Sequence, residues 1–316
     1  TFVLVMSFLF SCNKNYPIPD DIIKAQALML ERPDSALLIL EGMKGVEHLP
    51  AKLKATYNLC LIEARDKNYI VHTSDSLINT VVAFFEKEDD PLMKAKAYYY
   101  QGRVNKDLQN SEKAAFAFKK AETFVNETSD YRLKALICTQ MGGVFHYQRL
   151  FNDAIVWHEK AKDALLLAGD SVSISYILRD IASAYSNLKE YDKSLSLFND
   201  AYKVADANNQ LSVASNILYD IALMYIQRQM QDSVIVYMKK ALLKDSALVY
   251  FEGTCLTLAD EYRKINKLDS ARYYLSRCAN SNSLFTKAGY YYFLANIEED
   301  AGNYKKSLDA YKISYN

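Results

Sequence analysis

The sequence predicts an all-α fold built from repeated helix hairpins, and three observations lead to this prediction. Small residues recur every 40 positions, further small or β-branched residues follow each of them at a constant distance, and glycine and proline are scarce. The central series is Gly102, Gly142, Ala182 and Ala222. Self-similarity at a fixed period of about 20–50 residues is typical of repeat arrays, so we expect one supersecondary unit in each repeat.

Two further columns of residues indicate that each unit contains a second helix. Two antiparallel helices approach closely only where side chains are small, so small residues on both helices mark where they meet. The columns lie twelve and nineteen positions after each residue of the central series: Ala114, Ala154, Ser194 and Val234, then Ala121, Ala161, Ala201 and Ala241.

Composition narrows the class of protein. The 316 residues include 9 Gly and 5 Pro, below average usage, which disfavours β-sandwiches, dinucleotide-binding folds and loop-rich enzymes. Lys and Arg total 38 and Asp and Glu total 38, so no net field attracts nucleic acid or an anionic membrane. We therefore expect no nucleic-acid partner for this segment.

One unit reads Tyr98-x-x-Gln101-Gly102, followed by Ala114-x-x-x-Phe118-x-x-Ala121. This pattern resembles the tetratricopeptide repeat. The resemblance implies a right-handed superhelical solenoid of about eight antiparallel helix hairpins over residues 20–316. The usual repeat has about 34 residues, so the 40-residue unit here should carry longer helix ends.

The N-terminal residues predict an export signal and a lipid anchor. Residues 1–11 are almost wholly apolar, too few to span a bilayer but typical of a signal-peptide core whose basic start is missing. Leu9-Phe10-Ser11-Cys12 resembles a bacterial lipobox, which implies lipid attachment at Cys12, a tether over 12–19 and a place in the bacterial cell envelope. The alternative is a buried N-terminal segment with an incidental cysteine.

The first hairpins follow from local signals. Asp20 or Asp21 begins a helix that continues to about Glu31, and Pro33 suits the first position of the next helix. The second unit has helices near 51–67 and 74–87, joined by an unusually long connection at 68–73. Asp-Ser-apolar triplets, at Asp34, Asp75, Asp232 and Asp269, indicate the starts of second helices, because Asp there complements the helix dipole.

The regular period fills residues 91–245, and two more units are centred near Ala259 and Ala295. Apolar periodicity persists to the last residues, whereas a terminal repeat normally presents a polar outer face. We therefore expect the native chain to continue beyond Asn316.

Residues 20–125 also resemble a group of lipoprotein-like repeat proteins from Bacteroidetes. In that group a transmembrane helix and a DNA-binding region often follow, so the resemblance implies the sensor arm of a transcriptional regulator. The segments that carry this likeness are Glu31-Arg32-Pro33-Asp34-Ser35-Ala36-Leu37, Asp66-Lys67-Asn68-Tyr69, Thr73-Ser74-Asp75-Ser76-Leu77-Ile78 and Ala97-Tyr98-Tyr99-Tyr100-Gln101-Gly102-Arg103-Val104.

No residue pattern predicts catalysis. The four histidines lack metal-ligand spacing, and no phosphate loop or nucleophile motif occurs. His158 falls in the column of Phe118 and Phe198, which favours a core role. Cys255 and Cys278 belong to one hairpin, where they either bridge or remain free thiols. We expect no enzyme, no cofactor, no metal and no small-molecule substrate.

The inner face of the array is the predicted binding surface. Tyr and Arg are the residue types that binding hot spots favour, and a groove of this kind holds an extended peptide or a partner helix. The alternatives are tyrosines that merely fill gaps between repeats, and a glycan-binding lipoprotein associated with an outer-membrane transporter. Projection of the tetratricopeptide groove selects Tyr99, Arg103, Lys106, Tyr147, Arg179, Tyr219 and Tyr292.

Overall fold

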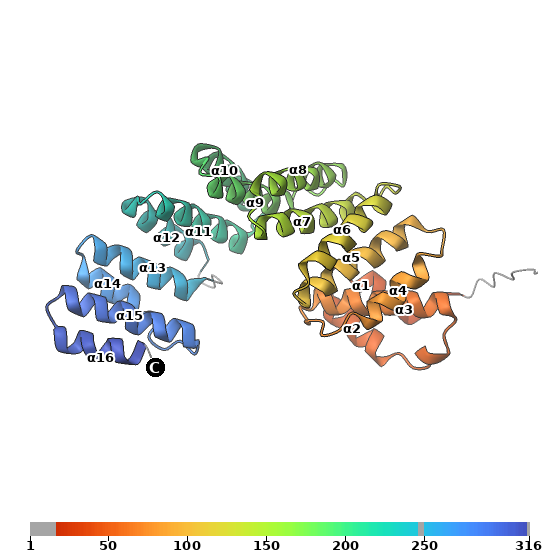
Figure 1. The fold of residues 1–316 in the computed structure, drawn as a ribbon, viewed down its shortest axis with the longest axis horizontal. Helices are drawn as coiled ribbons and strands as arrows, with labels where there is room; N and C mark the ends of the chain where they lie inside the picture. Colours follow the sequence, from red (N-terminus) through yellow and green to blue (C-terminus); the bar gives the residue numbers. More distant parts are fainter. Residues whose placement is uncertain (1–16, 246–249, 315–316) are drawn as a thin grey trace, which may run out of the picture. The chain divides into compact units, whose positions relative to one another are not determined.

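The computed structural model describes residues 17–245 and 250–314. Within these ranges the chain forms sixteen α-helices and one 3₁₀ helix, Val46–His48, and no strand (Figure 1). The predicted signal segment 1–11 and the proposed lipid-attachment residue Cys12 lie outside the described residues. In the described ranges no helix is long and apolar enough to cross a membrane.

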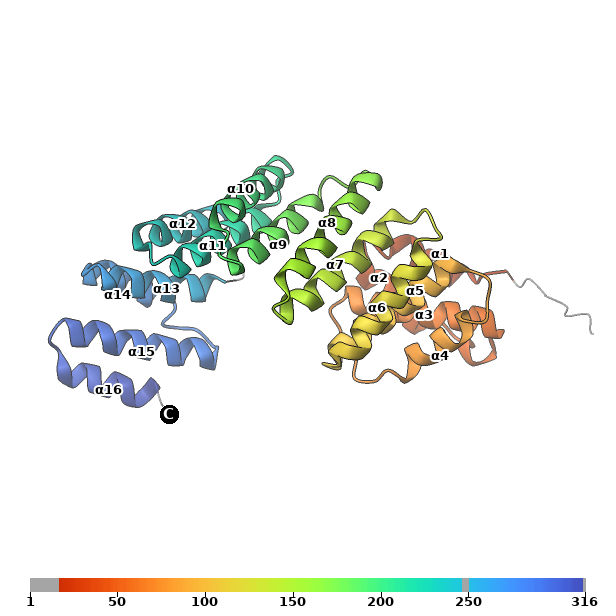
Figure 2. The ribbon, with the colours of Figure 1, turned by 45° about the horizontal axis from the view of Figure 1, so that its top comes forward.

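Consecutive helices pair as eight antiparallel hairpins, which confirms the predicted all-α tetratricopeptide-like fold (Figure 2). The densest contacts join the two helices of one hairpin, as between α5 and α6 and between α9 and α10. The pairs are α1 (Asp20–Leu28) with α2 (Pro33–Gly42), α3 (Ala51–Lys67) with α4 (Ser76–Phe85), α5 (Pro91–Asp107) with α6 (Ser111–Val125), α7 (Tyr131–Tyr147) with α8 (Phe151–Leu167), α9 (Ile174–Asn187) with α10 (Tyr191–Ala207), α11 (Leu211–Gln227) with α12 (Gln231–Lys244), α13 (Phe251–Lys264) with α14 (Leu268–Ser276), and α15 (Leu284–Asp300) with α16 (Tyr304–Ser314).

The turns inside the hairpins repeat with the same period. In the second to sixth hairpins the residue two positions after the end of the first helix has positive φ: Tyr69, Gln109, Arg149, Lys189 and Gln229. Around Gln109, the backbone amide of Asn110 donates to the Asn105 carbonyl at 2.8 Å. The backbone amide of Gln109 donates to the Lys106 carbonyl at 2.9 Å. This is the Schellman arrangement, which satisfies helix-end carbonyls and is usually built on glycine.

The small residues are buried at helix contacts, as predicted. Ala182 and Ala222 have no exposed surface. A Cβ atom placed on Gly102 would lie 2.4 Å from the Phe118 ring, so only glycine permits this approach. The Asp-Ser triplets also lie at the starts of α2, α4, α12 and α14. Asp75 is the N-cap residue of α4 and its side chain makes no capping hydrogen bond. Asp34, Asp232 and Asp269 lie in the first turn of their helices, where a negative charge complements the helix dipole.

The chain divides into two compact units, one that runs to Ile137 and one that begins at Cys138. In the first unit, α1, α2 and α3 share a core that includes Ile22, Leu40 and Tyr57. In the second, α9 to α12 enclose a larger core around Phe198 and Ile221. Each unit therefore has a hydrophobic core of its own.

The cysteines of the described ranges are buried free thiols. Cys278 donates a hydrogen bond to the Leu275 carbonyl at 3.1 Å. Burial, and secondarily the nearby Cys255, raise the pKa of Cys278 to about 12. A thiol with so high a pKa is a poor nucleophile, so these cysteines act as core residues.

Candidate functional site

Helix α5 carries the three predicted groove residues of the first unit. Tyr99 is only 5% exposed, and its ring lies 6.0 Å from the Phe118 ring in the core. Arg103 binds Asp66 of α3, with Nη2 and Nε 2.8 and 2.9 Å from Oδ1. Burial alone would lower the pKa of Arg103, but the hydrogen bond and charge of Asp66 raise it. Lys106 is exposed on the same helix.

A hollow of about 420 Å³ lies beside this column within the first unit. Its lining includes Tyr100 rather than Tyr99, and Lys96 one helical turn earlier on α5. The walls mix apolar groups with charges of both signs, including Glu63 and Arg132. Such a surface suits a peptide, which offers both kinds of group. The residues that line it are Gln26, Met29, Leu30, Glu63, Lys67, Lys96, Tyr100, Asp130, Arg132, Leu133 and Leu136.

In the second unit the predicted Arg179 belongs to a charged cluster on α9 and α11. Its guanidinium pairs with Asp220 of the next hairpin, and both side chains are largely buried. Asp180 lies beside this pair, and in the described part of the chain no hydrogen bond or ion pair engages its carboxylate. Burial raises the pKa of Asp180 to about 6; the charge of Arg179 opposes this shift and that of Asp220 adds to it.

Two tyrosines extend the same surface. Tyr219 stacks on Tyr250 with ring centroids 4.9 Å apart and an interplanar angle of 17°. Burial raises the pKa of Tyr219, as do the nearby Asp220 and Tyr250. On α11, one turn before Asp220, the Oδ1 atom of Asn216 is buried without a hydrogen-bond partner. The surface therefore presents one buried acceptor without a partner, on Asn216, and one half-buried carboxylate, on Asp180, that no described side chain engages.

The remaining predicted residues lie elsewhere in the second unit. Tyr147 ends α7 and is 83% exposed. Tyr292 on α15 is 43% exposed, and its ring lies edge-on to Tyr311 at 6.1 Å. The structure thus brings together Arg179 and Tyr219, through Asp220 and Tyr250.

Sequence reasoning did not select Asp180, Asn216 or Tyr250. Asp180 and Asp220 are 40 positions apart, so an acidic residue at the same place in two successive repeats was the available signal. Within the described ranges, no group of three or more His, Cys, Asp or Glu side chains is arranged to hold a metal ion.

Comparison with known proteins identifies the fold of this chain but assigns it to no family. No family model matches the sequence, and no curated protein matches it. Solved structures do match. The apo form of RapI aligns with a TM-score of 0.71 at 13% identity, covering 93% of this chain and 95% of that chain. NprR in complex with its cognate peptide NprX gives 0.61 at 15% identity, covering 92% and 86%.

A third similar structure is a signal-transduction ATPase with numerous domains and a tetratricopeptide repeat sensor, from Pyrococcus horikoshii. It aligns with a TM-score of 0.74 at 16% identity, covering 93% of this chain and 46% of that chain. At these identities the likeness establishes the tetratricopeptide-like fold alone.

Proposed function

We propose that this protein is a non-enzymatic interaction scaffold, and that the Asp180 face of its second unit binds a peptide or protein segment carrying a Lys or Arg side chain. The observation that carries this proposal is the Asp180 carboxylate, which lies half-buried beside the Arg179–Asp220 pair and has no hydrogen-bond or ion-pair partner among the described residues. A desolvated acid gains most from an added cation, because Coulombic attraction is stronger away from water. The stacked Tyr219 and Tyr250 offer an aromatic surface beside the Arg179–Asp220 pair.

Similar structures support a peptide ligand. One of them is NprR in complex with its cognate peptide NprX, and another is a Rap protein complexed with Competence and Sporulation Factor. The Rap complex aligns with a TM-score of 0.63 at 15% identity. By analogy, a helical repeat of this kind suits an extended peptide.

Selection from a displayed random peptide library, with residues 13–316 as bait, tests the proposal. We expect enrichment of peptides with Lys or Arg, and about tenfold weaker binding of the selected peptides to Asp180→Asn, the loss that follows removal of one charged hydrogen bond. The matched control is Asp200→Asn, which changes an exposed acid paired with Lys203. Selection of neutral peptides, or equal binding by both variants, would contradict the proposal, as would enrichment on a glycan array alone.

We further propose that the protein is held at the bacterial envelope by acyl chains on Cys12 and serves as the sensor arm of a regulator. The apolar segment 1–11 and the cysteine that ends it support this. Labelling cells with an alkyne fatty acid should mark the native chain and not Cys12→Ser. Export without labelling would exclude the anchor while leaving the peptide-binding proposal intact.

A further inference from the structure

The second hairpin departs from the repeat at one place. Helix α3 ends as its neighbours do, with positive φ at Tyr69 and the Ile70 amide donating to the Arg65 carbonyl at 3.0 Å. Helix α6 then begins at Ser111, two residues after its turn residue Gln109, whereas α4 begins only at Ser76. Both helices end in phase, at Phe85 and Val125. The second hairpin therefore lacks the first turn of its second helix rather than containing extra chain.

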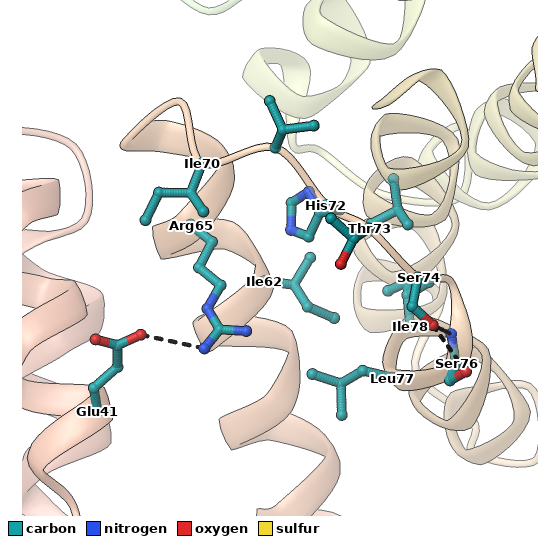
Figure 3. A pocket seen from close by; sticks show the side chains of 12 residues that line it. Glu41, Ile62, Arg65, Ile70, His72, Thr73, Ser74, Ser76, Leu77 and Ile78 are labelled. Carbon is teal, nitrogen blue, oxygen red and sulfur yellow. Dashed lines mark hydrogen bonds and ion pairs between the residues drawn. The ribbon is translucent and has the colours of Figure 1, made fainter. Parts of the chain in front are cut away.

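The segment that replaces this turn, residues 70–75, is rich in β-branched residues, which form helix poorly. It forms one wall of a pocket of about 450 Å³ within the first unit (Figure 3). The other walls come from four helices and are mostly apolar, with Ile62 on α3, Leu77 and Ile78 on α4, and Val104 on α5. Glu41 on α2 and Arg65 on α3 add a charged pair to this lining. This volume falls in the range of about 300–1,000 Å³ typical of small-ligand sites.

His72 lies in this segment with a fixed orientation. Its backbone amide and its Nδ1 atom both bond Oδ2 of Asp107 on α5, at 2.9 and 2.7 Å. An ionised carboxylate only accepts hydrogen bonds, so in the neutral ring the proton lies on Nδ1 and Nε2 is an acceptor. The His72 side chain is 9% exposed, and Nε2 is buried with no hydrogen-bond partner.

Four of the other polar residues around the pocket bond one another in pairs, and a fifth, Thr73, is exposed. Arg65 donates to Glu41 at 3.2 Å, and the Ser74 hydroxyl donates to that of Ser76 at 2.9 Å. Figure 3 shows His72, Ile62 and Leu77 between these two pairs. The buried polar atom that lacks a hydrogen-bond partner at this pocket is therefore His72 Nε2. An unsatisfied buried acceptor costs about 1–3 kcal/mol.

We propose that this pocket binds an apolar molecule, or an apolar side chain of a partner, that carries one hydrogen-bond donor, as an indole or a phenol does. The apolar body covers Ile62, Ile78 and Val104, and the donor bonds His72 Nε2. Because Nε2 has almost no exposed surface, the exposed residues Val71 and Thr73 shift slightly to admit the donor. This site is independent of the Asp180 face, since it lies in the other unit.

Titration of the full chain with indole and with 1-methylindole, followed by amide NMR shifts, tests the proposal. 1-Methylindole carries a methyl group in place of the N–H donor of indole. We expect indole to bind about fivefold to tenfold more tightly and to shift residues 62–78, and we expect His72→Phe to abolish the difference between the probes. Leu77→Trp, which fills the pocket, should remove binding of both, while Asp180→Asn should change neither.

A second pair of probes separates a free ligand from a side chain of a partner. If N-acetyl-tryptophanamide binds as well as indole, the backbone does not clash and a Trp side chain can enter; weaker binding favours a free molecule. The proposal fails if indole and 1-methylindole bind the unaltered chain equally, if the preference for indole survives in His72→Phe, or if neither probe shifts residues 62–78.

Discussion

His158 of α8 packs directly over Gly142 of α7, and a Cβ atom placed on Gly142 would lie 2.5 Å from Cε1 of the imidazole. The imidazole therefore occupies space that any other residue at 142 would fill. This contact corresponds, one repeat on, to that between Gly102 and Phe118. The two glycines allow a bulky ring from the second helix of each hairpin to reach the first.

Substitution Gly142→Ala should destabilise the second unit by about 1–2 kcal/mol. Overpacking costs about 1–3 kcal/mol, and the better helix propensity of alanine returns up to about 1 kcal/mol. Urea unfolding followed by fluorescence of Trp157, the single tryptophan, measures this unit. The control is Gly143→Ala on the same helix. A Cβ atom added there meets nothing within 4 Å, so this substitution should stabilise the unit. Equal effects at the two positions would contradict the contact.

Stability should fall in acid because His158 must stay neutral. Burial, with a smaller effect of His146, lowers the pKa of His158 to about 4, below the ordinary 6.5. The unfolded chain therefore binds the proton first, and stability that is complete above pH 6.5 is lost as pH falls toward 4, by roughly 3 kcal/mol at most. Phenylalanine occupies the position of His158 in the two neighbouring repeats, as Phe118 and Phe198. His158→Phe should therefore make stability less dependent on pH. His48→Phe, at an exposed site, should not.

The turn residues with positive φ should improve when replaced by glycine. Lys189 adopts φ 63°, a conformation that costs an L-residue about 1 kcal/mol and glycine almost nothing. Part of this gain is offset by the greater freedom of glycine in the unfolded chain. Lys189→Gly should therefore raise the unfolding free energy by about 0.5 kcal/mol, whereas Lys203→Gly inside α10 should lower it by about 1 kcal/mol. Thermal melts by circular dichroism of both variants provide the check.

Binding of a cationic peptide at the Asp180 face should strengthen as pH rises. The pKa of Asp180 is raised to about 6 by burial, so its carboxyl is protonated at pH 5 and ionised at pH 7. Only the ionised form attracts a Lys or Arg side chain, and binding should therefore tighten several-fold across this interval. Fluorescence anisotropy of a selected peptide at pH 5, 6 and 7 measures the change. Asp180→Asn should give a flat profile; an unchanged slope in that variant would assign the effect to another group.

The fold could be predicted because its signals are local. The central small residues mark helix contacts wherever they occur, and the predicted helix 51–67 coincides with α3. Orientation about a helix axis was harder to predict. Tyr99 and Tyr100 are neighbours about 100° apart around α5, and only the packed structure shows that Tyr100 lines the hollow.

The polar sites depend on partners distant in sequence. The orientation of His72 depends on its hydrogen bond to Asp107, 35 positions later. The site around Asp180 depends on the Arg179–Asp220 pair, which joins two hairpins. The long connection at 68–73 was visible in the sequence, but its spacing did not indicate a missing helical turn. The pattern of small residues indicates where two helix backbones come close. It does not indicate which charged groups lack a partner.

The missing turn of α4 has a broader consequence. Because the coil of residues 70–75 occupies the same stretch of sequence as a helical turn would, α5 follows 40 residues after α3, as α7 follows α5. A tandem protein of this kind can therefore exchange a few helical residues for a chamber without changing its length or disturbing the modules on either side. Mutation could, by the same route, add new chambers to other modules one at a time.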